Sequence, residues 1–151
     1  MGGGEQAKYL IRMEVYDYIK AGESELVAAM GPKAVPALKN LIDMGNFWEQ
    51  TKAVEALCRI DDPKSTRILK KLLEHPERTL RKAVIEIIGD RELGWLGERL
   101  RKMEKQDPDH AVRWSARRAL DRRSSIPPAP RKKIPDNFGN LKSVGKRIVA
   151  R

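Results

Sequence analysis

The side chains that most clearly could bind a ligand are the Lys and Arg residues near the end of the chain. Residues 122–151 hold nine Lys or Arg and one acid, a net charge of +8, whereas the preceding 121 residues carry only +2. Cationic groups spaced along a chain can bind phosphates and release counterions. The candidate contacts to nucleic acid or to a partner, one aromatic ring included, are Arg113, Arg117, Arg118, Arg122, Arg123, Arg131, Lys132, Lys133, Phe138, Lys142, Lys146 and Arg147.

Catalytic and metal-binding groups are sparse. His75 and His110 fall in or beside predicted turns, and with the distant Cys58 they form no set with the spacing of a metal site. Cys58 follows Leu57 in a helical stretch, where a small buried side chain is the default and no base stands ready to activate a thiol. We therefore expect a protein that is not an enzyme and needs no cofactor.

The cellular compartment is indicated by the cysteine count and by the hydrophobicity. A single cysteine cannot form a disulfide within the chain, as is typical of a reducing compartment, so we expect a cytoplasmic protein. No run of 18 or more apolar residues is present, which predicts no membrane span. The oligomeric state stays open.

The elements that position these side chains are helices in a repeating pattern. Ala, Leu, Glu, Lys and Arg dominate the first 120 residues, a composition that favours helix. Leu38, Leu69 and Leu100 recur at intervals of 31 residues, and each has an apolar residue three positions later, as one face of a helix requires. We predict helices over residues 5–21, 24–30, 33–44, 47–60, 64–74, 77–88, 91–105 and 109–122.

Second helices accompany the leucine-bearing ones. The small residues Ala53, Ala83 and Ala116 align in these second helices and would let neighbouring helices approach closely, with Leu57, Ile87 and Leu120 four positions further on. Asp62 and Asp107 each precede a proline, which predicts a capping carboxylate and a proline in the first helical turn. Helix pairs that repeat about every 30 residues indicate an all-α solenoid in which stacked neighbours form the core.

The segment DPDHAVRWSARRAL, residues 107–120, resembles the second helix of HEAT-like repeats of the PBS-lyase type. The matching residues are Val112, Arg113, Ala116, Ala119 and Leu120. The resemblance covers about residues 32–122, three repeats, and implies a right-handed α-solenoid whose concave surface, formed by the second helices, mostly binds proteins. In place of Val112-Arg113 the first two repeats have Glu49-Gln50 and Thr79-Leu80, which argues against an Asp–Arg ladder between neighbouring repeats.

We predict a short solenoid of stacked HEAT-like helix pairs over residues 5–122. Residues 5–30 form an N-terminal cap or degenerate repeat, and residues 32–122 form three repeats. Apolar residues cover most of the circumference of the first helix, which predicts either wide burial or a partner face that includes Tyr9, Tyr16 and Tyr18. Residues 123–151 are proline-rich and basic, so we expect an extended C-terminal tail outside the solenoid.

Three functions stay open. The leading interpretation is a non-catalytic interaction or scaffold module that binds a protein partner on the solenoid, while the basic tail docks to a partner or larger assembly. The alternative is a nucleic-acid-binding protein in which the tail and the last helix contact phosphates of RNA or DNA. The third is a component of a repeat-type enzyme, such as a DNA glycosylase or a bilin lyase.

The tryptophans bear on the third function. HEAT-repeat DNA glycosylases place tryptophans beside a flipped base, so that Trp48, Trp95 and Trp114 are candidates for such a site. No clear acid stands beside them in the sequence. We therefore favour packing in the core or between repeats for all three.

Overall fold

A computed structural model describes residues 2–125, so that all but the first three residues of the predicted tail lie outside the described residues. Over this range the chain forms eight α-helices, one 3₁₀ turn (Gly31–Ala34) and no strand, and no helix has the length and apolar character needed to cross a membrane. The α-helices are α1 (Gly2–Lys20), α2 (Ser24–Ala29), α3 (Val35–Met44), α4 (Phe47–Leu57), α5 (Pro63–Leu72), α6 (Arg78–Ile88), α7 (Leu96–Gln106) and α8 (His110–Ser125).

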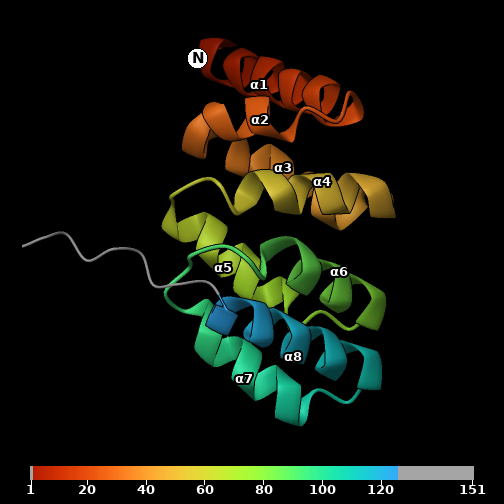
Figure 1. Ribbon diagram of the computed structural model, residues 1–151. Helices are drawn as coiled ribbons and strands as arrows, with labels where there is room; N and C mark the ends of the chain where they lie inside the picture. Colours follow the sequence, from red (N-terminus) through yellow and green to blue (C-terminus); the bar gives the residue numbers. More distant parts are fainter. Residues whose placement is uncertain (1, 126–151) are drawn as a thin grey trace, which may run out of the picture.

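The helices stack as antiparallel pairs (Figure 1). Among the second helices of the pairs, α4 packs against α2 and α6, and α6 packs against α8. Among the first helices, α3 packs against α1 and α5. The all-α fold of stacked helix pairs is confirmed, and α1 with α2 extends the same order at the N-terminal end.

Local signals fix where the helices begin. Asn46 caps α4 through a reciprocal pair of hydrogen bonds with Glu49, and Asp62 accepts a hydrogen bond from the Lys64 amide just before α5. The cap predicted at Asp107 is wrong. Helix α8 begins at His110, and Asp109 accepts the hydrogen bond from the Val112 amide at its start. The Asp107 carboxylate lies before the helix, where it accepts from the Asp109 amide and from Arg81 of the neighbouring repeat.

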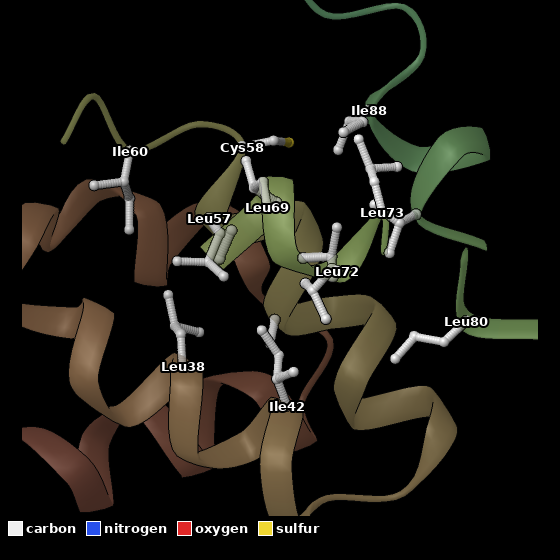
Figure 2. Packing of buried hydrophobic residues seen from close by; sticks show 14 of the residues in the cluster. Leu38, Ile42, Leu57, Cys58, Ile60, Leu69, Leu72, Leu73, Leu80 and Ile88 are labelled. Carbon is white, nitrogen blue, oxygen red and sulfur yellow. The ribbon is translucent and has the colours of Figure 1, made fainter. Parts of the chain in front are cut away.

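The predicted leucine period lies in the core. Leu38, Leu69 and Leu100 are all buried, and Figure 2 shows Leu38 and Leu69 among the other apolar side chains that fill the space between stacked helices. Burying a leucine side chain contributes about 1.5–3 kcal/mol, so each member of this row adds to the stability of the stack. We call the row of Leu38, Leu69 and Leu100 the leucine seam.

The alignment of the second helices needs one correction. Ala53 and Ala116 are buried as predicted, but Ala83 is only half-buried and Val84 takes its place in the core. Helices α4 and α6 therefore repeat at the same 31-residue interval as the first helices, whereas α8 follows α6 at 32, because Ala116 lies 16 positions after Leu100 and Val84 lies 15 after Leu69. The same shift places Ile88, not Ile87, at the buried position that follows.

Several helix boundaries differ from the predictions, and α4, for example, ends at Leu57 rather than at 60. Helix α7 begins at Leu96 rather than at 91, because residues 89–95 form consecutive turns whose Gly89 and Arg91 carbonyls accept hydrogen bonds from Arg123. Helix α1 begins at Gly2, and α8 continues to Ser125. Residues 123–125 are therefore helical, not extended as predicted.

Candidate partner-binding surface

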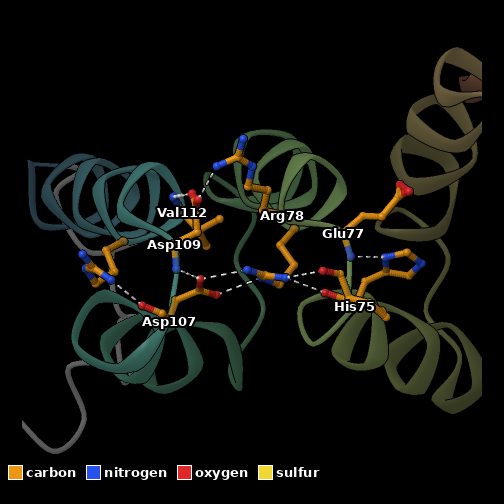
Figure 3. A network of polar contacts seen from close by, with 9 residues as sticks. His75, Glu77, Arg78, Asp107, Asp109 and Val112 are labelled. Carbon is orange, nitrogen blue, oxygen red and sulfur yellow. Dashed lines mark hydrogen bonds and ion pairs between the residues drawn. The ribbon is translucent and has the colours of Figure 1, made fainter.

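A buried ion pair joins the last two repeats. The Arg81 guanidinium of α6 donates from Nε and Nη2 to the two carboxylate oxygens of Asp107, at 2.9 and 3.0 Å, and the two side chains are only 10% and 5% exposed (Figure 3). The Nη1 atom of the same guanidinium donates to the carbonyls of His75 and Pro76, at 2.7 and 3.0 Å. Each nitrogen of the guanidinium thus donates at least one hydrogen bond, and a buried charge is tolerated when it is paired and hydrogen-bonded in this way.

This pair shows that the expectation of no Asp–Arg ladder was wrong for the second and third repeats. The counterpart of Arg113 in the second repeat is Arg81, one position later than the sequence comparison placed it. The two arginines make the same local contact, because Arg113 donates to the Asp107 carbonyl six residues before it, as Arg81 does to the His75 carbonyl. In the first repeat Gln50 stands at this position and donates to the Ile42 carbonyl.

A second, exposed link lies beside the buried one. Arg78 donates to the Asp109 carboxylate at 3.0 Å, again from the second repeat to the third. This hydrogen bond, with that from the Val112 amide, lowers the pKa of Asp109 below its usual range. Polar contacts therefore fix how the third repeat sits on the second, in addition to the leucine seam.

Most of the arginines predicted to bind phosphate are engaged within the protein. Arg117 pairs with Glu104 at 2.9 Å, and Arg122 pairs with Asp90 at 2.8 Å. Arg113 and Arg123 donate to backbone carbonyls, as described above. The hydrogen bond that Arg117 donates to the Glu104 carboxylate raises the pKa of the guanidinium.

Arg118 differs from these four. Its side chain is exposed on α8 and makes no hydrogen bond or ion pair with any of residues 2–125. The other predicted contacts, from Arg131 to Arg147 with Phe138, lie outside the described residues.

The second helices form a surface with two adjoining hollows. The first, of about 330 Å³, lies between α4 and α6 and is lined by Phe47, Thr51, Glu55, Thr79, Lys82, Ala83, Glu86 and Ile87. The second, of about 210 Å³, lies between α6 and α8 and is lined by Glu86, Asp90, Ser115, Arg118 and Arg122. Glu86 borders both hollows, so that they adjoin across the three helices, and we call the two together the second-helix groove.

The groove combines apolar and charged groups. Phe47 is 48% exposed at its α4 end, and Ala83 and Ile87 are half-buried along its wall. The exposed acid Glu86 is 3.6 Å from Lys82 within the same helix, and Arg118 lies at the α8 end without a partner in the described range. The arrangement can hold a chain that carries an apolar side chain at one end and an acid at the other.

The tryptophans follow the packing prediction only in part. Trp95 is half-buried and packs against the core beneath Lys70, whose ammonium lies 5.4 Å from the ring centroid. Trp48 is 45% exposed, and Trp114 is 58% exposed on α8, so core packing is wrong for Trp114. Trp114 occupies the repeat position of Thr51 and Lys82, which face the solvent side of the second helices in every repeat.

The three tyrosines of α1 do not form one face. Tyr9 is 58% exposed, whereas Tyr16 and Tyr18 are half-buried against the core. The Tyr16 hydroxyl accepts a hydrogen bond from the Asn40 amide of α3. Tyr16 and Tyr18 therefore help to attach α1 to the stack, and only Tyr9 is available to a partner.

The histidines and the cysteine form no reactive centre. The His75 Nδ1 atom accepts a hydrogen bond from the Glu77 amide at 3.1 Å before α6. No group of three His, Cys, Asp or Glu residues within residues 2–125 is arranged to hold a metal ion. Cys58 is buried, and its thiol donates to the Glu55 carbonyl at 3.1 Å, as expected for a small core residue.

The Cys58 thiol should be slow to react in the folded protein. Burial raises its pKa, so that little thiolate forms near neutral pH. We expect labelling by an aromatic disulfide reagent at pH 8 to be at least about tenfold slower in native than in urea-unfolded protein. Because the unfolded thiol ionises first, the free energy of unfolding should also fall as the pH rises through the ordinary thiol pKa. Equal labelling rates in the two states would contradict the burial of Cys58.

A larger hollow, of about 470 Å³, lies between the second and third repeats at the turns within each pair. Leu73, Pro76, Met103 and Pro108 give it apolar walls, and Arg81 with Asp107 lies at its edge. The Arg99 and Glu74 side chains at its rim pair with each other. Its principal charges are therefore already used in holding the two repeats together, which makes it a weaker candidate than the second-helix groove.

Stacked helix pairs, a leucine seam and a buried Arg–Asp pair between neighbours define a helical-repeat protein of the α-solenoid class. A family model described as HEAT repeats matches residues 35–121, more than half of the chain, and the chain belongs to this family. No curated protein and no solved structure matches the chain significantly. HEAT-repeat modules typically serve as scaffolds for protein interactions.

Proposed function

We propose that the protein is a non-catalytic interaction module that binds a protein partner in the second-helix groove. The observation that carries the proposal is the exposure of Phe47 and Trp114 on the same layer of helices that holds the groove. Large aromatic side chains are enriched at the centres of protein interfaces. Membership of the HEAT-repeat family supports the same class of function.

The chemistry of the groove defines the partner segment. Phe47 and Ile87 offer apolar contact, whereas Arg118 offers a guanidinium that can bind a carboxylate through two hydrogen bonds. We therefore propose a segment with an apolar anchor and an acidic residue. The groove crosses three helices, so that the segment lies across the stack rather than along one helix.

Site-specific cross-linking tests this proposal. A photoreactive amino acid at Thr79, which is exposed in the groove, should capture the partner, whereas the same amino acid at Lys71, exposed on α5, should not. Adding Phe47→Ser to the Thr79 variant should reduce the adduct at least about tenfold, because an interface anchor is removed. The measurement is mass spectrometry of the adducts from cells. Equal capture at Thr79 and Lys71 would place the partner elsewhere.

Nucleic-acid binding is the second candidate, and the charge of the sequence is the observation that favours it. Residues 126–151 hold seven bases and one acid. If these bases contact phosphates, affinity for RNA or duplex DNA falls steeply with salt, and changing Arg131, Lys132 and Lys133 to Gln in the full chain reduces the slope by about three. An affinity that does not change with salt concentration, or a salt dependence that is the same in the triple variant, would exclude this function for the tail.

A further inference from the structure

The two ends of the stack differ in chemistry. Val54 of α4 and Ile85 of α6 occupy equivalent repeat positions, and both are fully buried. The equivalent residue of α8 is Arg117, which pairs with Glu104 at 2.9 Å and with Asp121 at 3.4 Å. An ion-paired arginine at this position ends the apolar contact between second helices, as in the capping repeats of solenoids.

The N-terminal end of the stack keeps an apolar surface. Helix α1 buries Val15 and Ile19 against the rest of the stack. On its opposite side Tyr9, Leu10 and Met13 are 58%, 60% and 40% exposed. These three residues fall within one arc of the helix at 100° per residue, and among residues 2–125 no other helix packs on the outer side of α1 (Figure 1).

We propose that this α1 face binds the same face of a second copy of the chain, which gives a two-fold symmetric dimer. A head-to-tail contact would set the apolar α1 face against the charged Arg117 edge, and burying that edge would cost the hydration of three charged groups. Self-association through identical patches avoids this cost and closes after two copies. The surface is separate from the second-helix groove, so that the proposal does not depend on the proposed function.

The charges of α1 fit this symmetry. In an antiparallel pair of α1 helices, Glu5 near the start of one helix lies beside Lys20 at the end of the other, twice in the dimer. Both residues are exposed and make no ion pair with any other residue of the described range. Antiparallel helix dipoles are also favourable at the two ends. The contact is small, below about 1,200 Å² of total buried surface, which predicts a weak dimer.

Sedimentation equilibrium of the full chain over a concentration series tests the dimer. We expect Leu10→Glu to weaken dimerisation at least about tenfold, because a charge would be buried against Met13 and Leu10 of the other copy. Leu10 is largely exposed in the monomer, so that folding should be unaffected. Trp114→Glu is the matched control: it places the same charge at an exposed apolar residue on the other end of the stack, and dimerisation should not change.

A charge exchange separates the α1 contact from other modes of association. Glu5→Lys and Lys20→Glu should each weaken the dimer, and the double variant should restore it, because the pairs re-form with reversed sign. A chain that stays monomeric up to about 1 mM would overturn the proposal. The proposal would also be wrong if Leu10→Glu left the dimer intact or if Trp114→Glu dissociated it. The same holds if the double variant dimerised no more tightly than the single variants.

Discussion

Replacing Asp107 with alanine is expected to lower the free energy of unfolding by about 3–5 kcal/mol. The substitution leaves the buried Arg81 guanidinium with its Nε and Nη2 donors unsatisfied and without a counter-ion. It also removes the acceptor of the Asp109 amide just before α8. Urea unfolding followed by circular dichroism measures the loss.

Controls distinguish the buried pair from an ordinary surface charge. Asp43→Ala breaks an exposed pair with Lys39, in which both side chains are more than half exposed, and should cost no more than about 1 kcal/mol. The double variant Arg81→Met with Asp107→Leu should recover part of the stability, since apolar side chains can replace a buried pair. A loss below about 1 kcal/mol for Asp107→Ala would contradict the burial and geometry of the pair.

The fold was largely predictable because its main determinant is a simple apolar period. The recurrence of Leu38, Leu69 and Leu100 predicts that three similar helices bury the same face. All three leucines are buried, which confirms this prediction. The Arg81–Asp107 pair was missed for a definite reason. Ala116 lies 16 positions after Leu100, whereas Val84 lies 15 positions after Leu69, and an alignment on alanines therefore placed Ala83 where Val84 belongs.

The candidate site was less predictable, because composition does not reveal which charges are already paired. Arg122 meets Asp90 from 32 residues away, and Arg117 meets Glu104 across a helix pair. Neither contact can be known before the helices are placed. The exposure of Trp114 could not be predicted from the sequence either, because a large apolar residue in a helix is more often buried than exposed.

Replacing Leu69 with alanine should lower the free energy of unfolding by about 2–5 kcal/mol. Leu69, the middle residue of the leucine seam, is 2% exposed, and Figure 2 shows it near Leu57 and Leu72 in the core. Lys71→Ala, an exposed position on the same helix, is the control and should stay within about 0.5 kcal/mol of the parent protein.

The Leu69 variant also tests how the repeats depend on one another. In a stack, each repeat is stabilised mainly by its neighbours, so that damage to the middle repeat uncouples the two ends. Variants that keep only Trp48, in the first repeat, or only Trp114, in the third, report on each end by fluorescence. In the parent background the two reporters should give the same urea midpoint, and with Leu69→Ala the midpoints should separate. Midpoints that stay together while the stability falls would mean that contacts other than the leucine seam couple the ends, with the Arg81–Asp107 pair the first to examine.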